Sequence, residues 1–422
     1  MSLKKKNYFF KAFCLIVALF LKLFLSAYSV WSYEFISIVN ASTIEFSYKK
    51  AFHSLWIYLF NTIYNFWLLL PINHPDLKPW LINFEEFPNF FESYLLILLF
   101  KAPIIFFDFL CGLLIYSLTK KLSNERKAIL AMSFWIFNPY LTLTIEMSGT
   151  LEVIPLAFML FSFLMLMNKK IVKSFLALAS GIALKLLPVL AFPVYAILIA
   201  KLKLESIKKR ILSLILAIVT GIILYAIPFY FSKKDFLSSL LEYTPQTFYI
   251  SEVLIRPPVF TIGLSSFFSC FFLLVLLEYW DWKNGFSINQ ALEAIIGYFI
   301  IFLAFFNWYP SYLLLAIPFL AIDFALNKPR RIYVILWFLF AFLFSLIAFD
   351  YTPSNSLFFI SSHGEFASLL LILLKWIKED KLMNLIGMPF FRSAFTGVSI
   401  FYALIIILEN SSRIKKTILK MN

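Results

Sequence analysis

Charged residues are scarce in this sequence. Only 14% of its 422 residues are Asp, Glu, Lys or Arg, while 62% are hydrophobic. A soluble globular domain is closer to half apolar and a quarter charged. The excess is more than one core can hold, because single cores stop growing at about 250–300 residues. The composition therefore excludes an ordinary soluble protein and predicts a chain whose surface faces lipid.

Cysteine and histidine are rare as well, with three of each. The cysteines lie inside apolar stretches, and the histidines are far apart in sequence. Neither set has the spacing of a metal site, a disulfide framework or a zinc-protease motif. The sequence therefore indicates no cofactor, although it leaves a divalent metal open.

Basic residues outnumber acidic ones, which gives the chain a formal net charge of +14. In a soluble protein such a charge would suggest nucleic acid as a partner. Here the Lys and Arg residues form short clusters between apolar runs, which is typical of cytoplasmic loops in membrane proteins. We therefore expect no nucleic-acid partner. The expected location is the plasma membrane of a prokaryote or the endoplasmic reticulum of a eukaryote.

The first apolar run, residues 9–31, follows three lysines and is longer than the core of a signal peptide. It predicts a retained membrane helix with a cytoplasmic N-terminus. Because a membrane-spanning helix needs roughly 20 apolar residues, the chain predicts an all-α, polytopic transmembrane helical bundle of about 10–12 passes. One integral membrane domain, residues 1–422, is the economical interpretation.

The apolar runs and basic clusters place these passes along the chain. Passes are expected at 94–118, at 128–167 as a pair with an outer turn near 148–151, at 211–231 and at 291–306. The first outer loop, 32–93, contains aromatic amphipathic stretches at 51–70 and 80–91, which are typical of helices lying in the membrane interface. The run 174–200 has bases at both ends and predicts a re-entrant hairpin.

Charged side chains at membrane depth cost about 2.5–3.5 kcal/mol each, so they are functional candidates unless they reach the interface. Glu34 follows the first helix at the outer surface, where a carboxylate can act as a general base; an ordinary interfacial acid is the alternative. Lys101 and Asp108 are seven residues apart, about two helical turns, and share one side of a helix without pairing. Contacts to neighbouring helices explain them equally well.

Two further pairs of residues are candidates for substrate binding. Glu146 and Glu152 flank the outer turn and could position a sugar or an acceptor; a solvated corner is the alternative. Lys185 near the hairpin tip could hold a lipid phosphate as a point charge. Arg256 at an outer helix start could bind phosphate through its fork of donors, or simply mark the membrane boundary.

Four segments within about residues 30–325 carry a resemblance to a known family. They are Lys101-Ala-Pro103 with Asp108; Trp135-Ile-Phe-Asn138-Pro139 followed by Gly149-Thr-Leu-Glu152; Gly181-Ile-Ala-Leu-Lys185-Leu-Leu-Pro188; and Phe306-Asn-Trp-Tyr-Pro310. In this order they resemble the GT-C membrane glycosyltransferases. The nearest branch contains the GPI mannosyltransferases, the GPI-transamidase subunit PIG-U and prokaryotic polyprenol-phosphate-dependent mannosyltransferases.

The resemblance implies a GT-C fold and an inverting transfer of a hexose such as mannose. The donor would be a polyprenyl or dolichyl phosphate sugar, and the acceptor a glycan or lipid outside the cytoplasm. Family members usually carry an Asp in the first outer loop. This chain has no Asp between the first helix and Asp76, and Glu34 stands at about that place. Glu34 is thus the expected base, with Glu146, Glu152, Lys101, Asp108, Lys185 and Arg256 as expected substrate-binding residues.

Two other functions remain open from the sequence. A catalytically inactive, PIG-U-like member would act as a subunit among other membrane-protein subunits. A lipid-linked sugar transporter is the third hypothesis. It is disfavoured because transporters often show internal repeats with broken helices in matching halves, and the sequence has no such repeat.

Overall fold

The computed structural model of the protein describes residues 16–27, 33–43, 54–76, 91–185, 288–305, 310–348 and 388–421, with a few positions between 188 and 219. Within these ranges the chain is all-helical: 89% of it is helix and no strand occurs. The predicted all-α class is therefore confirmed for this part of the chain.

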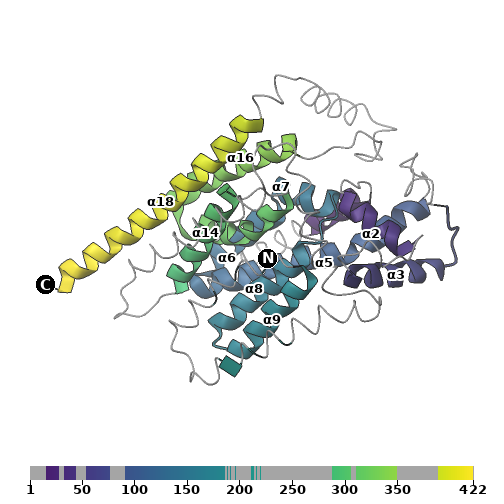
Figure 1. The fold of residues 1–422 in the computed structure, drawn as a ribbon, viewed down its shortest axis with the longest axis horizontal. Helices are drawn as coiled ribbons and strands as arrows, with labels where there is room; N and C mark the ends of the chain where they lie inside the picture. The colour runs from purple at the N-terminus through teal and green to yellow at the C-terminus, as the bar shows by residue number, and fades with distance from the viewer. Residues whose placement is uncertain are drawn as a thin grey trace, which may run out of the picture. The chain divides into compact units, whose positions relative to one another are not determined.

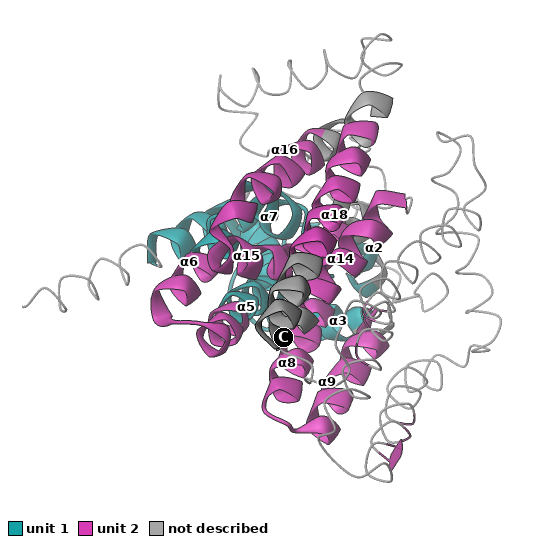
Figure 2. Cartoon of the chain, turned by 90° about the vertical axis from the view of Figure 1, so that its left-hand side faces the viewer, with its two compact units in different colours: residues 1–112, 133–154, 350–376 teal, residues 113–132, 155–349, 377–422 magenta. Residues whose placement is uncertain are grey.

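The chain divides into two compact units that alternate along the sequence (Figure 2). Unit 1 comprises Met1–Gly112, Ser133–Ile154 and Asp350–Trp376. Unit 2 comprises Leu113–Met132, Pro155–Phe349 and Ile377–Asn422. Each unit is described by itself below.

The first described helix of unit 1 is Ile16–Ala27, and three further elements follow. These are α2 (Tyr33–Thr43), α3 (Ser54–Leu68) and the first part of α5 (Phe91–Leu122). The helices α2 and α3 lie side by side, and Phe60 of α3 joins them to α5 (Figure 1). The Phe60 ring meets Phe35 of α2 at 5.8 Å and Phe100 of α5 at 5.0 Å between centroids.

The helix α3 matches the predicted amphipathic stretch 51–70, whereas α2 was not predicted. Part of α3 is buried, at Trp56, Ile57, Phe60 and Trp67, while Phe66 and Leu68 are exposed. Exposed apolar residues beside buried ones suit a helix that lies in the membrane interface, which stays a prediction. The second predicted stretch, 80–91, lies almost wholly outside the described residues.

In the region predicted as two passes, residues 128–167, the helical path is interrupted. The helix α6 (Glu125–Ile136) ends before the short α7 (Pro139–Leu141) and the π-helix η2 (Thr142–Met147). The predicted turn near 148–151 is confirmed, because the chain is non-helical from Ser148 to Glu152. It then enters α8 (Val153–Met167).

In unit 2, α8 and α9 (Ile171–Leu184) form an antiparallel pair. Ser162 and Ser174 join them, each hydroxyl donating to the other residue's carbonyl at 2.6 and 2.8 Å. The helix α9 begins before Lys173, so this lysine is part of the helix and not of the preceding loop as predicted. It ends at Leu184, and Lys185 is extended, so the run 174–200 is interrupted at the predicted position. The rest of the predicted hairpin lies outside the continuous described ranges.

The C-terminal half of unit 2 is a helical bundle. It consists of α14 (Ile288–Phe305), η5 (Pro310–Leu315), α15 (Ile317–Leu326), η6 (Lys328–Arg330), α16 (Arg331–Ala348) and α18 (Met388–Met421). Figure 1 shows α18 running beside α16, and α18 also packs on α14. Between α16 and α18, Trp337 Nε1 donates to Ser399 Oγ at 3.1 Å.

Two helical stretches in the described ranges are long and apolar enough to cross a membrane. They are Phe91–Leu122 and Glu125–Met147. The first contains the predicted pass 94–118, and the second contains the start of the predicted pair. The other apolar helices described are shorter, so the predicted 10–12 passes remain a prediction.

Arg330 connects the helices of this bundle. Its side chain is fully buried among three carboxylates. The guanidinium lies 2.9 Å from Glu293 of α14, 3.4 Å from Asp323 of α15 and 2.6 Å from Glu409 of α18. Tyr402 donates a short hydrogen bond to Asp323, and Asn327 donates to it at 2.6 Å. One cation therefore holds three helices at one point.

We expect Arg330→Gln to destabilise the protein strongly, by about 3–5 kcal/mol, because it leaves buried carboxylates without their cation. Glu409→Gln is the matched control: Glu409 is 36% exposed, so its loss should cost at most about 1 kcal/mol. The measurement is the apparent melting temperature of the detergent-purified protein. Equal shifts for both variants would contradict the central role of Arg330.

Candidate functional site

The candidate site is built around a break in the helical path of unit 1. Asn138 follows α6, and its side-chain oxygen accepts a hydrogen bond from Tyr140 N at 3.0 Å, which caps α7. Pro139 occupies the first helical position, where its missing N–H costs nothing. The chain then widens into the π-helix Thr142–Met147, a form frequent at functional sites.

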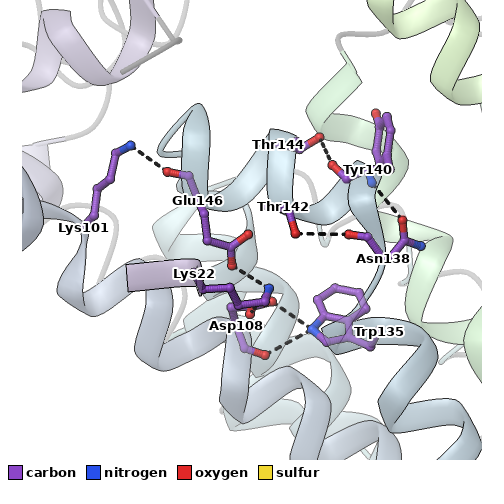
Figure 3. Close-up of polar contacts among 9 residues, drawn as sticks. All are labelled: Lys22, Lys101, Asp108, Trp135, Asn138, Tyr140, Thr142, Thr144 and Glu146. Carbon is purple, nitrogen blue, oxygen red and sulfur yellow. Dashed lines mark hydrogen bonds and ion pairs between the residues drawn. The ribbon is translucent and has the colours of Figure 1, made fainter. Parts of the chain in front are cut away.

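A buried ammonium group lies between two carboxylates at this break. Lys22 Nζ is 2.8 Å from Asp108 Oδ2 and 2.7 Å from Glu146 Oε1. All three side chains are at most 3% exposed. Trp135 Nε1 donates to the other oxygen of Asp108 at 2.9 Å. Figure 3 shows Lys22 pointing between the two carboxylates, so three elements of unit 1 meet at one charge.

Lys101 reaches the same π-helix through its backbone. Its Nζ donates to the carbonyl oxygens of Glu146 at 2.6 Å and Met147 at 3.1 Å (Figure 3). These carbonyls belong to the last turn of the helix. Carbonyl oxygens there have no N–H partner within the helix, so a nearby cation is favourable. Lys101 is itself fully buried.

The predicted relation between Lys101 and Asp108 is confirmed. Both side chains are buried on α5, and the bonds of each lead to other partners. Glu146 and Glu152 are 0% and 2% exposed, so the solvated-corner interpretation is wrong for both. Their predicted role in substrate binding stays a prediction. Glu146 Oε2 is buried without a hydrogen-bond partner among the described residues, which leaves it able to accept from a hydroxyl or water.

Glu34 is the second residue of α2, and its side chain lies outside the described part. The next residue, Phe35, is 1% exposed and lies beside the candidate site. Lys101 Nζ is 5.5 Å from the centre of its ring. Gly149, just after the π-helix, has a φ of +73°, and a Cβ there would lie 2.7 Å from the ring. The start of α2 is thereby held against the turn that follows Glu146.

The two expected phosphate-binding residues are not part of this cluster as described. Lys185 belongs to unit 2, where it follows α9 and is 8% exposed. Arg256 lies outside the described residues. Their predicted roles stay predictions.

Lys22 is the residue that the sequence reasoning missed. It stands in Leu21-Lys22-Leu23, near the middle of the apolar run 9–31. A lysine that far from the ends of such a run is itself a signal, since intramembrane charges are functional candidates. Its two carboxylate partners lie 86 and 124 residues away in sequence. No local pattern in the sequence indicates that Lys22 pairs with them.

The cluster brings two basic groups, Lys22 and Lys101, together with two acidic groups, Asp108 and Glu146. Pairing of this kind lowers the cost of placing ionisable groups in an apolar interior, where an isolated charge is expensive. No group of three or more potential metal ligands of the His, Cys, Asp or Glu type occurs in the described part of the chain.

Comparison with protein-family models, curated proteins and solved structures found no match to this chain.

We expect Lys22→Met to destabilise unit 1 by about 3–5 kcal/mol, because Asp108 and Glu146 would face each other without their ammonium. Adding Asp108→Asn should restore part of the loss, since one carboxylate alone repels nothing. Lys120→Met, at an exposed site on α5, is the matched control. The apparent melting temperature measures all of these. A single variant as stable as the control would show that the ion pairs contribute nothing.

Proposed function

We propose that the protein is a polytopic GT-C-type membrane glycosyltransferase. It moves a hexose such as mannose from a polyprenyl or dolichyl phosphate to a glycan or lipid acceptor on the non-cytoplasmic face. Glu34 is its general base. The sequence resemblance suggests this function, and the arrangement of unit 1 supports it.

One observation carries the proposal: Glu34 immediately precedes a residue packed on the Lys101–Glu146 region. Phe35 lies under the Lys101 ammonium, and Lys101 binds the Glu146 and Met147 carbonyls. The predicted base is thus on a helix anchored beside two predicted substrate-binding residues. One of the two helical stretches expected in the first outer loop, 51–70, corresponds to α3.

The reaction follows from these positions. Glu34 accepts the proton of the acceptor hydroxyl as its oxygen attacks the anomeric carbon of the donor sugar. The bond between that carbon and the phosphate oxygen breaks, and the lipid phosphate leaves with the electron pair. Attack from the face opposite the phosphate inverts the anomeric centre. The free Oε2 of Glu146 suits a hydrogen bond from a sugar hydroxyl.

Glu34→Gln should lower the transfer rate by about 10²–10⁴-fold, the usual contribution of a general base. Transfer is measured in membranes containing the protein, supplied with radiolabelled polyprenyl-phosphate mannose and their own lipid and glycan acceptors. Glu92→Gln on the first turn of α5 is the matched control and should leave the rate unchanged.

Other outcomes of this assay separate the competing functions. Full activity in Glu34→Gln would remove Glu34 from the mechanism. No transfer by the wild-type protein, together with stable co-purification of other membrane proteins, would favour the inactive-subunit hypothesis. Movement of the donor across the bilayer without transfer would favour the transporter.

A further inference from the structure

The ring of Phe35 is enclosed by three neighbouring residues of unit 1, namely Phe60, Gly149 and Lys101. The side chain is 1% exposed, and its ring also meets Phe60 edge-on at 5.8 Å. The backbone of Gly149 closes one side and the Lys101 ammonium lies 5.5 Å from the ring centre. A residue enclosed in this way has little freedom to shift along or around its helix.

Gly149 is required at its position for two separate reasons. Its φ of +73° is a backbone conformation that side chains disfavour. The space of a side chain is also occupied, because an added Cβ would lie 2.7, 3.0 and 3.1 Å from three atoms of the Phe35 ring. The nearest of these distances is too short for any real contact, so either the ring or the turn would have to move.

Lys101 fixes the other end of the same turn. It binds the carbonyls of Glu146 and Met147, three and two residues before Gly149. The turn is therefore held to α5 on one side and receives the Phe35 ring on the other. Any displacement of Phe35 displaces the preceding residue of α2, which is Glu34.

We infer that Phe35 is a positioning residue for Glu34. Gly149 and Lys101, which contact the Phe35 ring, form the seat that fixes the place of this ring. This inference rests on the proposed function, in which Glu34 is the base. It adds the residues that hold this base in place. Placement within an ångström matters for such a group, since a displacement of that size can cost about a hundredfold in rate.

The test uses Gly149→Ala, Phe35→Leu and the double variant in the full-length protein. Gly149→Ala should lower kcat by about 10–100-fold while the KM for the polyprenyl-phosphate donor stays unchanged. In the double variant the ring that meets the new methyl is absent, so the combined loss should be smaller than the product of the two single losses. Gly397→Ala in α18 is the matched control: its added methyl meets no atom within 4 Å, and kcat should not change.

A second measurement follows Glu34 without requiring activity. Dicyclohexylcarbodiimide labels carboxyl groups, and peptide mass spectrometry can follow the rate at Glu34 and, as a reference, at Glu92. Gly149→Ala should change the rate at Glu34 and leave that at Glu92 unaltered.

Two results would overturn the inference. One is a loss of activity in Gly149→Ala that matches the loss of folded protein, with kcat per folded molecule unchanged. The other is identical labelling of Glu34 in the wild type and in Gly149→Ala. If the wild-type protein transfers no sugar, the proposed function fails, and the labelling result alone decides whether the seat positions Glu34.

Discussion

The ammonium of Lys22 between the carboxylates of Asp108 and Glu146 is the interaction on which the organisation of unit 1 depends. The three groups come from the first helix, α5 and the π-helix, and this contact joins all three. In an interior of low dielectric constant the attraction is strong, but so is the cost of removing each group from water. Such a cluster therefore specifies one arrangement of helices more than it adds to net stability. It brings the Glu146 carbonyl within reach of Lys101, which in turn fixes the turn that receives Phe35.

Unit 2 uses the same principle with a different cation. Arg330 has a planar fork of donors, which allows it to bind carboxylates on three helices at once, while Lys22 as a point charge joins two. The two clusters are buried charge networks in helices that are otherwise apolar. Without a strong hydrophobic contrast between helix and lipid, polar contacts of this kind select which helices pair.

Much of the helical arrangement could be predicted because composition and apolar run length leave few choices. The pass at 94–118, the turn near 148–151 and the interruption at Lys185 each carry a local signal, namely charge, glycine or a base at a helix end. Other features depend on partners distant in sequence. The burial of Arg330 follows from Glu293 and Glu409, which no local pattern links to it. Lys22 looked like part of an apolar run because its neighbours are leucines, and its role follows only from two carboxylates that the fold brings to it.

The candidate site also contains some residues that a local sequence signal identifies and others that only the fold identifies. Lys101, Asp108 and Glu146 could be singled out from their cost at membrane depth, and they do come together. The helix α2 was not predicted, although its buried residues Phe35, Ile38, Val39 and Ser42 follow helical spacing. Glu34 was selected from its distance to the first helix, whereas the packing of the neighbouring Phe35 against Gly149 and Phe60 appears only in the fold.

The π-helix Thr142–Met147 has a consequence for how this segment tolerates length changes. A π-turn contains one residue more than the corresponding α-turn. A deletion in a regular α-helix turns every later residue by about 100°. Deleting one residue from the π-turn would instead let it close to an α-turn, so the change would be concentrated in the widened turn itself. That turn contains Glu146, which binds Lys22 through its carboxylate and Lys101 through its carbonyl, so its two contacts depend on the extra residue.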